Sequence, residues 1–308
     1  MGAMRKDYQI SGCKIVEGGS SEPYPIWVFI DPDKDEKRYL VEELKIDEHT
    51  LNSSLDPDEL ARLEFEPDHI ALIYKRPKNY SGKDQFLFKT GSSGVFLFKD
   101  RMVMVLSEDI PLFDGKQFTR VVALNDLLLK LLFRSVYHFL EHLKIISMIS
   151  DELEQKVNTS MENKYLINMF TLEKSLVYYL NAINSNSMLI EKLKMNAVKI
   201  GFTPEETEFL DDLVIENNQC IKQAEIYSNI LASLMDARVS IVSNNLNILI
   251  KTLNIITIAI MVPTLVVSAF SMNVKIPIAY HPQAFWMIMG MATVSVISLM
   301  ILWYYKRW

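Results

Sequence analysis

Two long stretches without a formal charge lie at the end of this chain. The first runs from residue 252 to residue 274 and the second from 276 to 305, and Lys275 is the only charged residue between them. Each is longer than the roughly 20 apolar residues that a helix needs to cross about 30 Å of hydrocarbon. Buried helices of soluble cores are usually shorter and rarely come as a pair divided by a turn. The two runs therefore predict two membrane-spanning helices.

The charges that flank these runs predict their orientation. Lys251 precedes the first run and Lys306 and Arg307 follow the second, whereas Lys275 stands alone between them. Positive charge near membrane spans is favoured on the cytoplasmic side. Both termini are therefore expected in the cytoplasm, and the short sequence Ser271-Met272-Asn273 is expected outside.

The first 123 residues have the pattern of a mixed domain. A short β-type run covers 26–30, and the sequence DPDELARLE at 56–64 predicts a capped helix. Three further apolar runs, separated by the turn-rich sequences PKNYSGKD and TGSSG, predict strands at 69–75, 85–89 and 95–107. This spacing favours antiparallel hairpins. We therefore expect an α+β cytoplasmic domain with an antiparallel sheet over residues 1–123.

Helical patterns occupy the chain from residue 124 onwards. Leu, Ile, Met, Glu and Lys recur at helical spacing over 124–200, which predicts at least two long helices with a break near 158–162. A new helix is predicted to begin at Pro204, because Thr203 is a suitable N-cap and Glu206 stands three residues after it. At 1.5 Å per residue, a helix that continues to the end of the first span is about 100 Å long. Most of it is therefore expected to be a cytoplasmic stalk.

These patterns divide the C-terminal part of the chain into segments. They are a helical region at 124–200, a stalk at 201–247, a first span at 248–270, an outer loop at 271–283, a second span at 284–305 and a basic tail at 306–308. Pro263 lies inside the first span. It is tolerated there because neighbouring helices can satisfy the freed carbonyl.

A seam of mostly polar residues follows the long helix into the first span. Alternating steps of four and three residues from Asp236 mark one face of a helix. The positions on this face are Ser240, Ser243, Asn247, Ile250, Asn254, Thr257, Met261, Thr264, Ser268 and Ser271. Polar side chains at membrane depth are costly against lipid, so the seam is expected to face another helix or water.

Two interpretations of this seam are open on the residues alone. Ser, Thr and Asn side chains can hold membrane helices together. Alternatively, several copies related by rotational symmetry could surround an aqueous path, with Ile250 and Met261 as apolar rings that gate by dewetting. One hairpin per chain cannot enclose a pore by itself.

From Pro204 to Trp308 the chain resembles the CorA-type divalent cation transporters, and the N-terminal domain resembles them in layout. The resemblance is carried by LMDARVSIVSNNLNILIKTLNIITIAIMVPTLVVSAFSMN, where Ser271-Met272-Asn273 stands in place of the family signature Gly-Met-Asn. It implies a homopentamer that is located in the inner (plasma) membrane and has a funnel-shaped cytoplasmic domain. It also implies that this signature is the selectivity filter, in which Asn273 meets a hydrated cation.

The resemblance further implies pore positions at Asn247, Ile250, Leu253, Met261 and Thr264. Leu253 from the resemblance and Asn254 from the seam are neighbours, and both are kept as candidates because a straight helix drifts relative to a strict heptad. The complete pore-lining set is Asn247, Ile250, Leu253, Asn254, Thr257, Met261, Thr264 and Ser268. Mg²⁺ gives up its water reluctantly, so a ring of neutral amide oxygens can select the hydrated ion through its outer shell.

A regulatory Mg²⁺ bound between subunits is also implied by the resemblance. The stalk carboxylate for this ion falls on Asp212, and Asp84 is the candidate partner from the α/β domain. A solvated helix face is the alternative interpretation of Asp211 and Asp212.

Two departures from the family pattern keep three functions under consideration. Ser271 replaces a Gly that allows backbone shapes disfavoured by a Cβ, and the outer loop carries Lys275 but no acidic residue. The first function is a passive homopentameric channel for hydrated divalent cations, with Mg²⁺ as the expected ion, Co²⁺ and Ni²⁺ as further candidates, and closure by intracellular Mg²⁺. The second is a proton-coupled Zn²⁺ transporter. The third is a non-conducting, membrane-anchored ion sensor or scaffold.

Other functional classes find little support in the sequence. It has neither a phosphate-cradling Gly loop nor a nucleophile elbow, so an enzyme, ATP-driven transport and an organic cofactor are not expected. The net charge of −6, without a basic stripe, argues against nucleic acid as a partner. His138 and His142 lie one helical turn apart without a third ligand, and are expected to be a solvated or half-buried pair.

Overall fold

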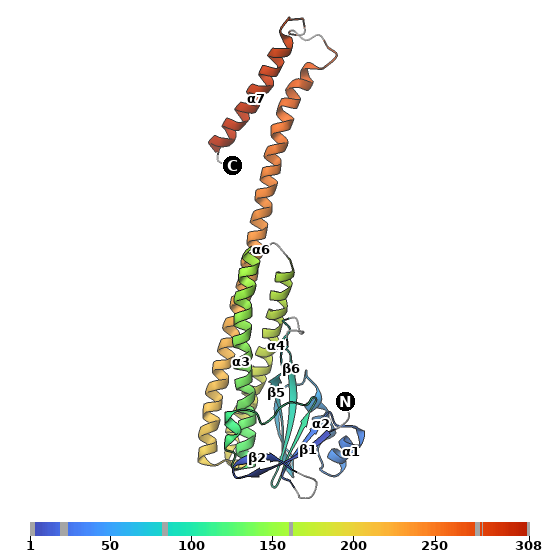
Figure 1. The fold of residues 1–308 in the computed structure, drawn as a ribbon, viewed down its shortest axis with the longest axis vertical. Coiled ribbons are helices and arrows are strands. Elements are labelled where there is room, and N and C mark those ends of the chain that lie inside the picture. The colour runs from blue at the N-terminus through green and yellow to red at the C-terminus, as the bar shows by residue number, and fades with distance from the viewer. Residues whose placement is uncertain are drawn as a thin grey trace. The chain divides into compact units, whose positions relative to one another are not determined.

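The computed structural model describes residues 4–18, 24–81, 86–159, 163–274, 278 and 280–306. The chain divides into two compact units, Met1–Met235 and Asp236–Trp308. Helix α6 (Pro204–Phe270) contributes residues to both units. Figure 1 shows the elements of each unit in chain order by colour.

A seven-stranded sheet forms the centre of the first unit, with the order β2-β1-β3-β7-β6-β5-β4. The strands are β1 (Met4–Ser11), β2 (Lys14–Glu17), β3 (Ile26–Ile30), β4 (Arg62–Phe65), β5 (His69–Pro77), β6 (Thr90–Phe98) and β7 (Met102–Leu106). Neighbouring strands are antiparallel except β3 and β7, which are parallel. The predicted α+β fold class is confirmed, with one parallel pair that the sequence pattern did not indicate.

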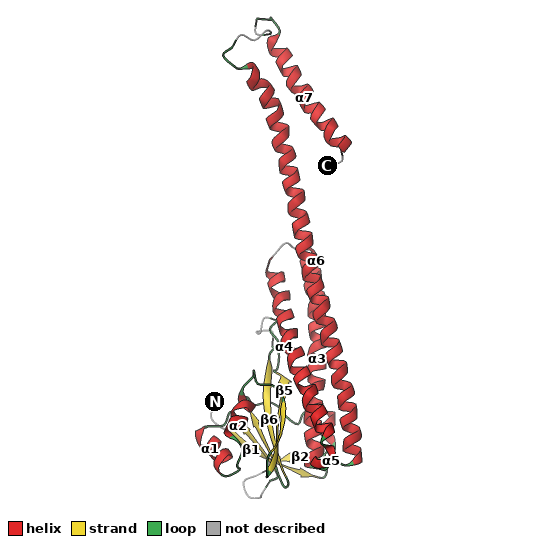
Figure 2. Cartoon of the chain, turned by 180° about the vertical axis from the view of Figure 1, so that it is seen from behind, coloured by secondary structure: helices red, strands yellow, loops and turns green. Residues whose placement is uncertain are grey.

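Helices cover both faces of this sheet and create two apolar cores. Helices α1 (Lys34–Glu42) and α2 (Glu48–Leu55) place Leu40 and Leu51 against Phe96 and Val105 on one face. The larger core lies on the other face, beneath α3 (Leu124–Thr159), α4 (Asn163–Met195) and the start of α6. Figure 2 shows these long helices beside the strands. The short helices η2 (Lys116–Thr119) and α5 (Ala197–Ile200) lie in connections.

The predicted capped helix at 56–64 is wrong. Helix α2 ends at Leu55, and β4 (Arg62–Phe65) is a strand that pairs with β5. The helices in this region begin earlier, at N-caps Asp33 and Asp47. Pairing with a long buried neighbour strand overrides the local helical preference of this segment.

The predicted strand at 85–89 is also wrong for the residues that the structure describes there, Phe86–Lys89. Strand β6 instead begins at Thr90 and includes the sequence TGSSG, which we expected to be a turn. A Cβ at Gly94 would lie 2.5 Å from the Cβ of Ser54 on α2. The small residues therefore serve close packing of a helix on a strand, not a change of chain direction.

The helix start predicted at Pro204 is confirmed. The backbone N–H of Glu206 donates to Oγ1 of Thr203 (3.2 Å), and the N–H of Thr203 donates to Oε2 of Glu206 (2.8 Å), which is a capping box. Buried residues then follow α6 at heptad-like spacing: Leu210, Leu213, Asn217, Cys220, Ala224 and Leu231. This spacing places one face of the helix in the larger core.

The second unit consists of the rest of α6 and helix α7 (Ala284–Lys306). Within the described residues, α6 and α7 are the two helices long and apolar enough to cross a membrane. Both views show α7 beside the C-terminal part of α6 (Figures 1 and 2).

Polar side chains of α3 and α4 attach these helices to the sheet. The side chain of Asn186 accepts from the backbone N–H of Lys75 (2.8 Å) and donates to its carbonyl (2.8 Å). Strand β4 pairs with β5 only as far as Ile73, so Asn186 takes the place of a missing strand neighbour. The hydroxyl of Ser135 also donates to the carbonyl of Lys75 (2.6 Å).

Replacing Asn186 by Ala is expected to lower the free energy of unfolding by roughly 2 kcal/mol, because the buried N–H of Lys75 loses its partner. Asn184→Ala is the matched control, since Asn184 is exposed on the same helix. Its effect is expected to stay within about 0.5 kcal/mol. Denaturant unfolding of the full chain in detergent measures both effects. Equal effects of the two substitutions would contradict the proposed role of the Asn186 side chain as a partner of the Lys75 backbone.

His138 and His142 belong to a buried cluster between α3 and α4. Nδ1 of His142 lies 2.6 Å from the hydroxyl of Tyr179, and the two histidine rings are 4.4 Å apart. Burial lowers the pKa of His142 from 6.5 to about 4 and that of His138 to about 3. His138 is half-buried, as predicted for the pair, whereas His142 is fully buried.

This cluster predicts acid sensitivity. Below pH 6.5 these histidines bind protons in the unfolded chain but stay neutral in the folded one. The free energy of unfolding should therefore fall between about pH 6.5 and pH 4, by on the order of 3 kcal/mol for His142. His142→Gln should flatten this pH dependence in unfolding experiments. His49→Gln, at an exposed histidine, should leave it unchanged.

Candidate functional site

Helix α6 presents two different faces within the second unit. Ile255, Ala259, Val262 and Val266 are partly buried and recur at steps of four, three and four residues. Helix α7 has a matching face, on which Ala292 is only 6% exposed. These partly buried faces are the sides that the two helices present to each other.

The predicted pore-lining residues are all exposed, and apart from Asn254 and Thr257, which line a cavity between α6 and α7, they lie outside this contact. These residues are Asn247, Ile250, Leu253, Asn254, Thr257, Met261, Thr264 and Ser268. Leu253 and Met261 are each 63% exposed. Polar atoms thus lie along a face of α6 that α7 leaves largely uncovered. Contact of this face with lipid would be unfavourable, because α6 is long and apolar enough to cross a membrane.

Two threonines on this face share one hydrogen-bond pattern. The hydroxyl of Thr257 donates to the carbonyl of Leu253 (2.8 Å), and that of Thr264 donates to the carbonyl of Ile260 (2.6 Å). Because the proton of each hydroxyl points to the backbone, the oxygen keeps acceptor capacity on its outer side. The face is therefore suited to groups that donate hydrogen bonds, such as the water shell of a cation.

The structure separates the neighbouring candidates Leu253 and Asn254. A cavity of about 530 Å³ between α6 and α7 is lined by Lys251, Asn254 and Thr257 on one side and by Leu302 and Trp303 on the other. Leu253 precedes the partly buried Ile255 by two residues, and at about 100° per residue it lies on the opposite side of the helix. The geometry places Asn254 on the flank towards α7 and Leu253 on the face away from it.

The Ser-Met-Asn sequence follows directly on the end of α6 at Phe270. The N–H of Ser271 donates to the carbonyl of Ser268 (3.1 Å), and its hydroxyl donates to the same carbonyl (2.9 Å). Ser271 is not among the described residues with positive φ, so its Cβ causes no backbone strain in place of Gly. Met272 and Asn273 are exposed.

Of the two carboxylates predicted for the regulatory site, the structure describes only Asp212. Asp212 is exposed on α6, and its neighbour Asp211 pairs with Nζ of Lys194 at 2.8 Å. Asp84 lies outside the described residues. Among the residues that are described, no group of three or more His, Cys, Asp or Glu side chains could hold a metal ion.

Comparisons with known proteins agree over nearly the whole chain. A family model described as CorA-like Mg²⁺ transporter protein matches residues 24–307. The chain is 26% identical over 325 aligned residues to the cobalt/magnesium transport protein CorA of Methanocaldococcus jannaschii, and the alignment covers 99% of this chain and 98% of that protein.

Solved structures with a similar fold extend this result. The complete structure of the CorA magnesium transporter from M. jannaschii gives a TM-score of 0.81 at 24% identity, covering 98% of this chain and 97% of that one. The full-length CmaX protein gives 0.76 at 14% identity, covering 99% and 98%. The ZntB cytoplasmic domain from Vibrio parahaemolyticus gives 0.62 at 15% identity, covering 79% and 100%.

The family model spans both units, including the long helix α6 and the apolar helix α7. It therefore covers the exposed polar face and the Ser-Met-Asn sequence together. This chain belongs to the family of CorA-like Mg²⁺ transporter proteins, which transport divalent cations across membranes.

Proposed function

We propose that this protein is a passive homopentameric channel for hydrated Mg²⁺, with the exposed face of α6 lining the pathway. The observation that carries the proposal is the row of exposed polar side chains along a membrane-length helix that ends beside Asn273. One chain cannot enclose a path, so several copies are needed. The number five comes from the resemblance to the family.

The chemistry of this face supports transport of a hydrated ion. Waters bound to Mg²⁺ donate hydrogen bonds outward, and Mg²⁺ demands a nearly ideal octahedral shell that it gives up reluctantly. The amide oxygen of Asn273 and the hydroxyl oxygens of Thr257 and Thr264 are neutral acceptors for such waters. Co²⁺ and Ni²⁺ carry similar shells and are candidate ions as well.

Apolar side chains on the same face support gating. Ile250, Leu253 and Met261 are exposed on the isolated helix and would form apolar rings around a symmetry axis. A narrow apolar constriction can stop ions by excluding water. We further propose that cytoplasmic Mg²⁺ bound between subunits at Asp212, with Asp84 as partner, holds the channel closed.

The proposed arrangement in the membrane follows from the flanking charges. Residues 1–247 and the tail at 306–308 lie in the cytoplasm, 248–270 and 284–305 cross the inner (plasma) membrane, and 271–283 lie outside. Lys251 and Lys306 mark the cytoplasmic side. Within the cytoplasmic part, 1–123 is the α/β domain, 124–200 the helical region and 201–247 the stalk.

Asn273→Ala is expected to reduce Mg²⁺ flux at least about tenfold, because each copy loses the amide that accepts from the hydrated ion. The measurement is Mg²⁺ uptake into vesicles that contain the reconstituted protein, driven by membrane potential without nucleotide. Asn218→Ala is the matched control, since Asn218 is an exposed asparagine on α6 within the first unit, outside the proposed pathway. Undiminished flux in Asn273→Ala would overturn the filter assignment.

Ser271→Gly in the same assay separates the channel from the alternatives. For a channel, the natural sequence already conducts and the variant changes the rate only. Flux that occurs in Ser271→Gly alone would identify the natural protein as a non-conducting sensor or scaffold. Zn²⁺ flux that requires a pH gradient would identify a proton-coupled transporter.

Single cysteines test which face of α6 meets water. In a chain with Cys13→Ser and Cys220→Ala, Leu253→Cys and Thr264→Cys are expected to react with a water-soluble thiol reagent. Val262→Cys, on the partly buried face towards α7, is the matched control and should react at least about tenfold more slowly. The reverse pattern would place lipid or a helix contact, not a pathway, at the polar face.

A further inference from the structure

The cavity between α6 and α7 has a charged end and an apolar end. Its volume of about 530 Å³ is within the range of about 300–1,000 Å³ that is typical of ligand pockets. On α6 it is lined by Lys251, Asn254 and Ile258, which recur at steps of three and four residues and so share one face of the helix. At 1.5 Å per residue, Ile258 lies about 10 Å further along the helix axis than Lys251. The wall therefore changes from charged to apolar along the cavity.

Helix α7 has the same gradient. Leu299, Leu302 and Trp303 line the cavity from this side. The chain reverses direction between the two helices (Figure 1), so Trp303 lies nearer to the charged end and Leu299 nearer to the apolar end. Trp side chains are enriched at the boundary between hydrocarbon and lipid headgroups. The charged end is therefore expected at this boundary and the apolar end within the hydrocarbon.

Lys251 lacks an anionic partner. It forms no ion pair with any residue that the structure describes. Residues 237–308 include five basic residues but no Asp or Glu. The nearest acidic residue before Lys251 is Asp236, about 22 Å away along α6. A counter-charge for Lys251 must therefore come from outside this part of the chain.

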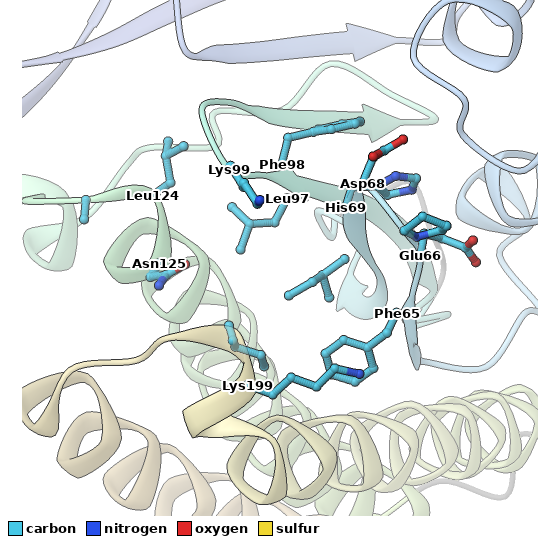
Figure 3. A pocket seen from close by; sticks show the side chains of 14 residues that line it. Phe65, Glu66, Asp68, His69, Leu97, Phe98, Lys99, Leu124, Asn125 and Lys199 are labelled. Atoms are coloured by element: carbon cyan, nitrogen blue, oxygen red, sulfur yellow. The ribbon is translucent and has the colours of Figure 1, made fainter.

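A hollow of about 820 Å³ in the first unit differs in this respect (Figure 3). It is lined by Lys99 and Lys199, but also by the acidic residues Glu66 and Asp68. Charges of both signs are thus present in its own wall. Among the described residues that line the cavity between α6 and α7, Lys251 is the only charged one. This cavity therefore favours an anionic ligand.

The cavity fits a lipid better than a neighbouring copy or a soluble anion. The second unit of another copy has the same basic residues and no acidic side chain after Asp236. A soluble anion such as phosphate would pair with Lys251 but leave Ile258 and Leu302 uncovered. An anionic phospholipid supplies both a negative headgroup and apolar chains, in the same order as the charged and apolar ends of the cavity.

We propose that this cavity binds an anionic phospholipid. The phosphate lies beside Lys251, and one acyl chain lies along Ile258, Leu299 and Leu302. Basic pockets between membrane helices at the cytoplasmic side are suited to anionic lipid headgroups. The site requires that both helices cross the membrane but not that the protein conducts ions. The lipid site and the channel can therefore fail independently.

The test uses Trp303 as a reporter in the cavity. The full-length protein with Trp286→Phe and Trp308→Phe is reconstituted into phosphatidylcholine vesicles that contain increasing fractions of brominated phosphatidylglycerol or brominated phosphatidylcholine. Bromine on an acyl chain quenches tryptophan fluorescence at short range. Phosphatidylglycerol is expected to quench Trp303 at a mole fraction about fivefold lower than phosphatidylcholine, because only its headgroup has a net negative charge.

Substitutions of Lys251 test the role of the charge. Lys251→Gln should remove the preference for phosphatidylglycerol, and Lys251→Arg should keep it, because arginine retains the positive charge. Lys222→Gln is the matched control, since Lys222 is an exposed lysine on α6 within the first unit. This control should leave the preference unchanged.

A second reporter decides whether the preference belongs to the cavity. The chain with Trp303→Phe and Trp308→Phe retains Trp286, which lies at the start of α7 and is not among the residues that line the cavity. Both lipids are expected to quench Trp286 equally. Equal preference at Trp286 would indicate a general attraction of anionic lipid to basic residues and would overturn the proposal.

Four further results would also contradict the lipid site. They are equal quenching of Trp303 by the two lipids, a preference that survives in Lys251→Gln, its loss in Lys251→Arg, and its loss in Lys222→Gln. If neither lipid quenches Trp303 while both quench Trp286, another copy of the chain covers the cavity and the proposal is wrong.

Discussion

Hydrocarbon does not satisfy polar groups, and this constraint governs the part of the chain that crosses the membrane. Helix α6 contacts α7 through one apolar face and leaves Thr257, Thr264 and Ser268 exposed. The threonine hydroxyls donate their protons to backbone carbonyls of the same helix, but their oxygens have no hydrogen-bond donor among the described residues. A single chain therefore leaves polar oxygen atoms exposed at membrane depth, where contact with hydrocarbon is costly.

The first unit also contains polar groups that need partners, here the backbone N–H and carbonyl groups of β5. Strand β5 continues beyond its neighbour β4, and Asn186 and Ser135 supply the hydrogen bonds that another strand would have made. Because buried backbone groups are costly when unpaired, these side chains fix the helices on the sheet.

Several elements could be predicted because their signals are local. The capping box at Thr203 and Glu206 needs only four residues, and the structure has the same hydrogen bonds. The predictions of a helix at 56–64 and of a turn at 90–94 were wrong because the secondary structure of both segments depends on residues that are distant in the chain. Arg62–Phe65 is a strand because β5 lies beside it, and Gly94 is in a strand because α2 packs on it.

The sequence by itself determined the two membrane-length segments, the start of the stalk helix and the polar face of α6, because charge, hydrophobicity and helical period are properties of consecutive residues. Only the tertiary structure decided that Leu253 and Asn254 lie on different sides of α6 relative to α7. The same holds for the hydrogen bonds of Asn186 on α4 with Lys75 on β5, since these residues are far apart in the chain. Contacts between distant segments depend on packing, and no periodic pattern within one segment encodes them.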